Sequence, residues 1–425
     1  MRTLIMRRCF VQSFRSSCSW KNVSAGPPDV IFGLNEACDR DPNPNKVNLG
    51  AGAYRDDAGL PFVLSAVKQA ETRVLIGQNK EYLPIAGNPN FCYQAIKLAL
   101  GPESPVLLEK RNATVQGISG TGSLRIGAAF LAKFAPSRTI WLPTPTWGNH
   151  PPIFNHAGMN VKFYRYYNPS TLGVDMSGLL EDLAQKIPSS DIVLLHACAH
   201  NPTGVDPSPE EWKEIASIFV SRRLIPFFDM AYQGFASGDV DRDAFALRLF
   251  ASSHLAPQRG SPGTMLLAQS FAKNMGLYGE RVGAFSLLTA SDDDASGRCM
   301  SQLKIIIRGM YSNPPLHGAS IATEILTDPD LKQTWLSELK TMAERLTCMR
   351  QSLRSALQRC GSTRDWSHIT KQIGMFCFTG LDPKQVARLK EEFSIYLTND
   401  GRISIASLTS KNVGYVAQAI HEVTK

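Results

Sequence analysis

Lys273 is the residue whose surroundings point most directly to chemistry. It lies in the run SFAKN at 270–274, with Ser270 three positions before it and Arg281 eight positions after it. An amine kept partly dehydrated and unprotonated by small and apolar neighbours can form an imine with an aldehyde. The hydroxyl and the guanidinium could meanwhile bind a phosphate. Taken alone, the segment is equally compatible with an exposed lysine beside a glycine-rich turn.

Two further segments place polar groups where apolar strands end. The run IVLL at 192–195 leads into a turn that contains Asn201, a position at which open α/β sheets bind ligands. The run at 226–228 leads to Asp229 and then to Tyr232. Such a carboxylate can pair with a protonated ring nitrogen, and the phenol can hydrogen-bond a ring oxygen. The alternatives are a plain Asn-Pro turn and an aspartate that caps a helix.

A fourth segment of small residues precedes a helix that we expect over 124–134. Its sequence, ISGTGSLR, contains Ser119, Gly120 and Thr121. Backbone N–H groups and hydroxyls at such a turn can form a cup for a phosphate. A glycine-rich turn without any ligand is the alternative.

The order of these segments is more informative than any one of them. A phosphate cup, an asparagine turn, an aspartate with a tyrosine, and a lysine in this order resemble the fold-type I pyridoxal-phosphate enzymes. Among these, the chain resembles the aspartate aminotransferases of the class I aminotransferase family. The resemblance extends over about 20–425 and includes NLG at 48–50 and YSNPP at 311–315. Gly279 and Tyr311 are more similar to the mitochondrial than to the cytosolic type.

The resemblance implies a cofactor and a role for each site residue. It assigns catalysis to Lys273, Asp229 and Tyr232, and His150 would support Asp229. The cofactor would be pyridoxal 5′-phosphate, with no metal, and its implied contacts are Ser119, Gly120, Thr121, Trp147, Asn201, Asp229, Tyr232, Ser270, Lys273, Arg281 and Tyr82. The implied substrate contacts are Gly52, Trp147, Asn201, Arg308 and Arg402. Tyr82 would reach the phosphate bound by the partner subunit.

Two arginines could bind the two carboxylates of a dicarboxylate substrate, because a planar guanidinium grips a carboxylate with two hydrogen bonds. Arg402 follows a turn and leads into a strand. Arg308 ends the apolar run 305–307, where a charge is costly unless it caps the element or faces a cleft. A surface salt bridge or a helix-end charge is the alternative for either residue. The resemblance implies that Arg402 binds the α-carboxylate, and that Arg308 binds the side-chain carboxylate from the other subunit.

The implied activity is transamination between L-aspartate and 2-oxoglutarate, which gives oxaloacetate and L-glutamate. The exchange would be ping-pong, through pyridoxal and pyridoxamine phosphate, in a homodimer with shared active sites. Two alternatives stay open: an aromatic or kynurenine aminotransferase, and a non-catalytic membrane- or fatty-acid-binding role. Competition between amino donors, measured on the purified protein, would distinguish the aromatic or kynurenine aminotransferase from the aspartate aminotransferase.

Three positions depart from the pattern of the family. Ala51 and Gly117 stand where valine and threonine are expected, and Ala406 is followed by Ser407 instead of glycine. None of these changes removes a chemical group. We therefore expect altered packing and altered kinetics, not loss of the chemistry.

Composition indicates a soluble globular protein. The 425 residues, of which 43% are hydrophobic and 19% charged, predict one very large or two ordinary domains. No apolar run reaches the roughly 18 residues needed to span a bilayer, so integral membrane association is not expected. The sequence has no dense patch of basic and aromatic residues, so we do not expect nucleic acid as a partner.

The nine cysteines show no paired spacing such as Cys-x-x-Cys, which argues against both a disulfide framework and a zinc site. Cys92, Cys198, Cys348 and Cys377 lie in apolar contexts, and we expect them to be reduced packing residues. Reduced cysteines fit the mitochondrial matrix or the cytosol and not secretion.

The N-terminus has the composition of a mitochondrial transit peptide. Residues 1–28 contain five basic residues and four clustered serines but no Asp or Glu. We expect a targeting segment over about 1–19 and delivery to the matrix; the alternative is a basic tail. Loss of four arginines by a cut near Ser17 would lower the formal charge from +8 to +4. The remaining positive charge would attract dicarboxylates.

The middle of the chain alternates apolar strands with amphipathic helices, which predicts an α/β fold with a mostly parallel sheet flanked by helices. The strands are expected at 115–118, 139–142, 161–164, 192–195, 226–228, 265–268 and 282–287. Helices are expected at 209–222 and 331–360, and a surface loop at 252–264.

The resemblance implies that both chain ends form a smaller α+β domain. The predicted divisions are an N-terminal arm with part of the small domain at 20–62, a large cofactor-binding domain at 63–335, and the rest of the small domain at 336–425. The active site would lie in the cleft between the domains and at a dimer interface.

Overall fold

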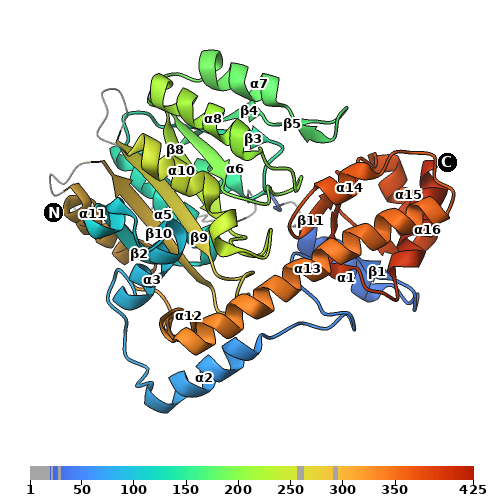
Figure 1. Ribbon diagram of the computed structural model, residues 1–425, viewed down its shortest axis with the longest axis horizontal. Helices are drawn as coiled ribbons and strands as arrows, with labels where there is room; N and C mark the ends of the chain where they lie inside the picture. The colour runs from blue at the N-terminus through green and yellow to red at the C-terminus, as the bar shows by residue number, and fades with distance from the viewer. Residues whose placement is uncertain (1–19, 21–22, 27–29, 256–262, 291–294) are drawn as a thin grey trace, which may run out of the picture.

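The computed structural model describes residues 20, 23–26, 30–255, 263–290 and 295–425. A large body around a central sheet lies beside a smaller lobe, and the long helix α13 (Pro329–Arg359) runs from one to the other (Figure 1). The predicted transit peptide at 1–19 lies outside the described residues. Within the described part of the chain, no helix is both long and apolar enough to cross a membrane.

The central sheet has seven strands in the order β2-β10-β9-β8-β7-β3-β4. Their bounds are β2 (Asn112–Ile118), β3 (Thr139–Thr144), β4 (Asn160–Arg165), β7 (Ile192–His196), β8 (Ile225–Met230), β9 (Thr264–Ser270) and β10 (Val282–Thr289). Strand β10 runs antiparallel to both β2 and β9, and the other pairs are parallel. The predicted mostly parallel sheet is therefore confirmed, and so is each of its predicted strands.

The central strands of the sheet are buried on both faces, which explains why they are continuous apolar runs, whereas the edge strand β4 is mostly exposed. Along β7, Ile192 and Leu194 join one core and Val193 and Leu195 join the other, because successive side chains point to opposite faces. The first core is covered by α5 (Ser119–Phe134), α6 (His150–Asn155) and α11 (Ala295–Tyr311). The second is covered by α3 (Pro89–Leu100), α4 (Pro105–Leu108), α7 (Met176–Glu181), α8 (Pro209–Arg222) and α10 (Phe245–His254).

The smaller lobe joins the two ends of the described chain. Strand β1 (Val47–Asn48) pairs in parallel with β12 (Ile395–Tyr396), and β11 (Phe376–Phe378) pairs antiparallel with β13 (Arg402–Ser404). Its helices are α1 (Val30–Arg40), α14 (Ser367–Lys371), α15 (Pro383–Phe393) and α16 (Val413–Thr424). The N-terminal stretch thus folds back on the C-terminal part, as the resemblance implied.

Shorter elements connect these parts. The body carries α9 (Val240–Asp243), a π-helical turn (Asp182–Lys186) and the hairpin β5 (Tyr167–Asn168) with β6 (Gly173–Val174). Helices α2 (Ser65–Gly77) and α12 (His317–Thr327) pack against each other and against α13.

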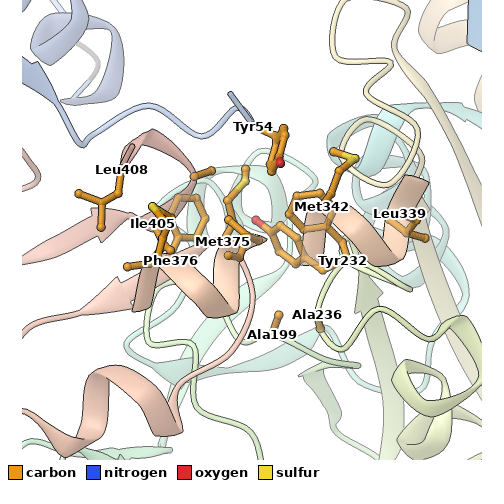
Figure 2. Packing of buried hydrophobic residues seen from close by; sticks show 14 of the residues in the cluster. Tyr54, Ala199, Tyr232, Ala236, Leu339, Met342, Met375, Phe376, Ile405 and Leu408 are labelled. Atoms are coloured by element: carbon orange, nitrogen blue, oxygen red, sulfur yellow. The ribbon is translucent and has the colours of Figure 1, made fainter. Parts of the chain in front are cut away.

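One apolar cluster connects the body to the lobe. Figure 2 shows the ring of Tyr232, from the loop after β8, among side chains that include Met342 from α13 and Met375 and Phe376 from the lobe. The Tyr232 and Phe376 rings meet edge to face, with centroids 6.4 Å apart. The position of Tyr232 therefore depends on packing between the two parts of the molecule.

Three local predictions were wrong in detail. Helix α5 begins at Ser119 and not at residue 124, so the small residues form its first turn. Both ends of the predicted loop at 252–264 are wrong, because α10 continues to His254 and β9 begins at Thr264; its central part, 256–262, lies outside the described residues. Cys348 is exposed, because it lies on the face of α13 that points away from the core. The other three named cysteines are buried and free of disulfides.

The two predicted helices were located well. Helix α8 has the predicted bounds and starts with a reciprocal cap between Ser208 and Glu211. Helix α13 begins two residues before its predicted start and ends one residue before its predicted end.

Candidate active site

A cavity at the carboxyl ends of the parallel strands gathers most of the predicted site residues, as expected for an open α/β sheet. The predicted residues in its wall are Gly52, Ser119, Gly120, Thr121, Trp147, Asn201, Asp229, Tyr232, Ser270, Lys273, Arg281 and Arg402. Leu124, His196, Cys198, Ala231 and Phe376, which the sequence did not single out, complete the described wall. Tyr82 and Arg308 do not line it.

Lys273 follows β9 and lines this cavity. Its Nζ atom lies 5.7 Å from the centroid of the Tyr232 ring. Burial lowers the pKa of Lys273 from its ordinary value; Asp229 acts in the opposite direction, and Arg281 lowers it further. Burial also raises the pKa of Tyr232 well above its ordinary value, so the phenol keeps its proton as a donor. The site thus favours a nucleophilic amine beside a neutral phenol.

Asp229 lies near the end of β8 and does not cap a helix. Its Oδ2 is 3.1 Å from Nε2 of His150, whose Nδ1 is 2.7 Å from Thr146 Oγ1. Burial alone would raise the pKa of Asp229, but the hydrogen bond from His150 and the nearby His196 and Lys273 bring it below its ordinary value. An ionised carboxylate only accepts hydrogen bonds, so Nε2 of His150 carries the proton. The support of Asp229 by His150, which the resemblance implied, is therefore present.

The first turn of α5 forms a cup whose shape depends on close packing. Ser119 has a left-handed backbone (φ 56°), and its N–H donates to the Arg281 carbonyl at 3.1 Å. The Ser119 and Ser270 hydroxyls are 3.0 Å apart. A Cβ on Gly120 would lie 3.2 Å from Cβ of Ser270, so a side chain at this position would require one of the two residues to shift by a few tenths of an ångström. No side chain among the described residues caps this helix start, so its N–H groups can bind an anion.

The turn after β7 is held by a carboxylate that the sequence reasoning missed. Asp206 accepts hydrogen bonds from the N–H groups of Ala199 (2.6 Å) and His200 (2.9 Å). Ala199 has φ 50°, a strained value for a residue with a side chain. Asn201 lies two residues after Ala199, and its N–H donates to Nδ1 of His196 at 3.3 Å. Asp206 therefore stabilises the turn that presents Asn201, and only its place in the NPTGVD run could have suggested this.

Arg402 projects from β13 of the smaller lobe into the cavity. Its Nη2 donates to the Gly50 carbonyl at 2.9 Å, and the guanidinium carbon lies 4.2 Å from the centroid of the Phe376 ring. The Nε atom is buried without a hydrogen-bond partner in the described structure, and burial lowers the pKa of Arg402. A buried cation with an unused donor is a binding site for an anion.

Arg308 and Tyr82 lie elsewhere on the molecule. Arg308 is exposed on α11, and its Nη1 is 2.5 Å from the Ser312 hydroxyl. The Tyr82 side chain is also exposed, at 84%. The described chain therefore does not bring these two residues into the cavity.

Comparison with known proteins places these observations in a family. The family described as aminotransferase class I and II matches residues 44–420. The chain is 57% identical to the mitochondrial aspartate aminotransferase of Xenopus tropicalis over 97% of this chain and 94% of that protein. Among solved structures, the Saccharomyces cerevisiae cytoplasmic aspartate aminotransferase is 43% identical, with a TM-score of 0.92 over 95% of this chain and 98% of that one.

A solved relative with a different name is also similar. The aromatic-amino-acid aminotransferase of Burkholderia pseudomallei, whose structure is titled as covalently bound to pyridoxal phosphate, is 43% identical with a TM-score of 0.90. The match covers 96% of this chain and 99% of that one. Sequence, fold and cavity agree, and the chain belongs to the class I and II aminotransferases.

Proposed function

We propose that this protein transfers an amino group between L-aspartate and 2-oxoglutarate with pyridoxal 5′-phosphate as its cofactor. The observation that carries the proposal is the meeting, in one cavity, of Lys273, the Asp229–His150 pair and Arg402. Relatives named aspartate aminotransferase that match nearly the whole chain support the substrate pair.

The residues of the cavity fit this cofactor at each of its polar groups. The first turn of α5, with Ser270 and Arg281, suits a phosphate. Asp229, which is kept ionised, suits a protonated ring nitrogen, and the Tyr232 phenol suits a ring oxygen. The amine of Lys273 suits an aldehyde. When bound, pyridoxal phosphate supplies that aldehyde and a ring that accepts electrons from the substrate.

The residues of the chain would divide the work of proton movement and positioning. The unprotonated Lys273 amine would remove the proton from the substrate Cα and deliver it to the carbon that carried the aldehyde, because burial disfavours the charged form of the amine. His150 holds Asp229 in place and in its ionised state. Arg402 would hold the α-carboxylate through its unused Nε donor, with the Phe376 ring against its other side.

The second carboxylate of the substrate would need a residue from outside the described cavity. We propose that Arg308 supplies this contact from the partner in a homodimer, and that Tyr82 reaches the partner's phosphate. The exposure of both side chains supports this assignment. An aromatic preference is the second candidate, favoured by the similar aromatic-amino-acid aminotransferase; it would not require Arg308.

We also propose the mitochondrial matrix as the location and the predicted domain divisions as the domain boundaries. The mitochondrial name of the Xenopus tropicalis relative and the basic, acid-free residues 1–28 support the location. The run of α13 from the body into the lobe supports a boundary near 335. A fluorescent fusion that lacks residues 1–17 should stay in the cytosol; unchanged mitochondrial signal would contradict the proposed address.

The proposed activity is tested with purified protein and pyridoxal phosphate. Oxaloacetate formation from L-aspartate and 2-oxoglutarate should exceed the rate with L-phenylalanine or L-kynurenine as donor at equal concentration. The absorbance spectrum of the loaded protein should change on addition of L-aspartate alone. A higher kcat/KM for L-phenylalanine or L-kynurenine would replace the substrate assignment, and no spectral change with any donor would reject the activity.

A further inference from the structure

Gly117, next to the end of β2, is a glycine because of space and not because of backbone conformation. It pairs with Gly283 in register within the sheet, and its φ is not left-handed. A Cβ at this position would lie 2.4 Å from Oγ of Ser123 and 3.1 Å from its backbone N. The first distance is far below van der Waals contact. The Ser123 hydroxyl thus occupies the volume in which the family resemblance led us to expect a threonine side chain.

The Ser123 hydroxyl in turn holds the first residue of α5. Ser123 is fully buried, and its Oγ donates to the Ser119 carbonyl at 2.8 Å. That carbonyl also packs closely against Gly283, because a Cβ on Gly283 would lie 2.5 Å from the Ser119 carbonyl carbon. Ser119 has the left-handed backbone described above, which a residue with a side chain adopts only when its surroundings hold it there.

We propose that Gly117 and Ser123 form an interdependent pair, in which the Ser123 hydroxyl positions Ser119 and so shapes the phosphate cup. Ser123 is a positioning residue: it acts through Ser119 and does not line the cavity. The consequence for phosphate binding rests on the proposed function, whereas the coupling within the pair is a property of the packing alone.

The geometry predicts that the effects of substituting Gly117 and Ser123 on phosphate binding are not additive. In Gly117→Ala, the new methyl group displaces the Ser123 hydroxyl from its bond to Ser119 or shifts the cup. In Ser123→Ala, the bond is already lost, and the atom nearest to a Cβ at 117 becomes the backbone N of residue 123, at 3.1 Å. A shift of a few tenths of an ångström then admits the methyl group. The double variant should therefore bind pyridoxal phosphate at least as tightly as the single variant that binds it less tightly.

The experiment compares wild type, the two single variants and the double variant, with two ligands. Dissociation constants are measured by absorbance titration of cofactor-free protein with pyridoxal 5′-phosphate and with pyridoxal, which lacks the phosphate. Ser123→Ala should weaken binding of pyridoxal phosphate roughly three- to tenfold, and Gly117→Ala at least as much, as expected for one lost hydrogen bond. The dissociation constant of pyridoxal should change less than about twofold in each of the three variants.

Matched controls come from other helices. Ser320→Ala removes a hydroxyl that makes the same kind of bond, to the Leu316 carbonyl at 3.0 Å, on α12. Gly414→Ala adds a methyl group in α16 where no described atom would lie within 4 Å. Neither control should change the ratio of the two dissociation constants.

Each result decides one part of the proposal. Additive losses in the double variant would overturn the pairing, and equal losses for pyridoxal and pyridoxal phosphate would overturn the link to the phosphate. If wild type binds neither ligand, the proposed function and the phosphate link both fail. The pairing is then judged from the urea unfolding midpoints of the four cofactor-free proteins, where non-additive shifts support it and additive shifts overturn it.

Discussion

The two arginines predicted to bind a dicarboxylate lie in opposite surroundings. Arg402 is buried in the cavity wall with an unused donor, while Arg308 is exposed on α11 and its guanidinium donates a hydrogen bond to the nearby Ser312. The Tyr82 side chain is exposed, like that of Arg308.

Under the proposed function, this difference separates what one chain assembles by itself from what the partner subunit would complete. Residues at strand ends converge because parallel strands end at the same edge of the sheet. An exposed side chain, in contrast, acquires a fixed position only when something packs over it. The lysine, the Asp229–His150 pair and Arg402 would then form a site for any amino acid, and Arg308 would add the dicarboxylate preference from the partner.

The largest effect is expected at the centre of the cavity. Lys273→Ala should lower kcat for L-aspartate by several orders of magnitude, because the amine that bonds to the aldehyde and moves the proton is lost. Binding of pyridoxal phosphate should persist through the phosphate cup. Lys213→Ala, on the exposed face of α8, is the control and should match wild type. Transamination by Lys273→Ala at the wild-type rate would remove the basis of the proposed site.

The comparison of the two arginines is tested directly by their leucine variants. Arg308→Leu should lower kcat/KM for aspartate and glutamate roughly 10²–10³-fold, because a carboxylate is buried without its partner. Rates with phenylalanine should hold or rise. Arg402→Leu should lower kcat/KM for every amino acid, because all share the α-carboxylate. An unchanged ratio of aspartate to phenylalanine activity in Arg308→Leu would favour the aromatic alternative.

Mixed dimers test whether Arg308 acts across an interface. Protomers with Arg308→Leu are unfolded and refolded together with protomers that carry Lys273→Ala. A mixed dimer then contains one intact site and one doubly altered site if Arg308 acts on the partner. Activity should therefore reappear on mixing. If Arg308 acts within its own chain, no mixed site is intact and the activity of the mixture stays low.

A smaller effect is expected at the carboxylate behind Asn201. Asp206→Asn replaces an acceptor of two N–H bonds by a group that can accept only one of them, and it should lower kcat/KM about tenfold. Asp239→Asn is the control for loss of a carboxylate charge, since Asp239 also accepts two backbone N–H bonds, but both at its Oδ1, at the start of α9. Equal activity of both variants would mean that the Asn201 turn keeps its shape without Asp206.

The smallest effect on activity is expected for a buried group away from the cavity. Burial lowers the pKa of His368 in α14 to about 4, below its usual 6.5. Below pH 6.5 His368 is protonated in the unfolded chain but stays neutral in the folded chain. The free energy of unfolding therefore decreases as the pH falls from 6.5 towards 4. His368→Gln should remove up to about 3 kcal/mol of this acid destabilisation, measured by urea unfolding at pH 7 and pH 4.5. Its transamination rate at pH 7.5 should equal that of wild type.

Much of the fold could be predicted because local pattern determines it. The apolar runs that became β7 and β8 are buried on both faces, and the helix at 209–222 carries its own cap at Ser208. The errors occurred where local composition competes with packing. The prolines and glycines within 252–264 suggested a loop that begins at residue 252, but α10 continues to His254. Cys348 has apolar neighbours in sequence and yet lies on the exposed face of its helix.

The residue types that we propose for the chemistry were determined by the sequence itself. An amine among small residues, a carboxylate and an asparagine at strand ends, and a glycine-rich helix start are local features, because each depends on a few neighbouring residues. Their resemblance to a known family added the order and the roles.

Only the tertiary structure decided how these residues act together. His150 reaches Asp229 from another element, Asp206 braces the turn of Asn201, and the hydroxyl of Ser123 fills the space beside Gly117. Each of these relations depends on distances between side chains that only the packed fold establishes. A pKa, likewise, depends on burial and on charges brought close by folding, so the lowered pKa of Lys273 could not be derived from its neighbours in the sequence.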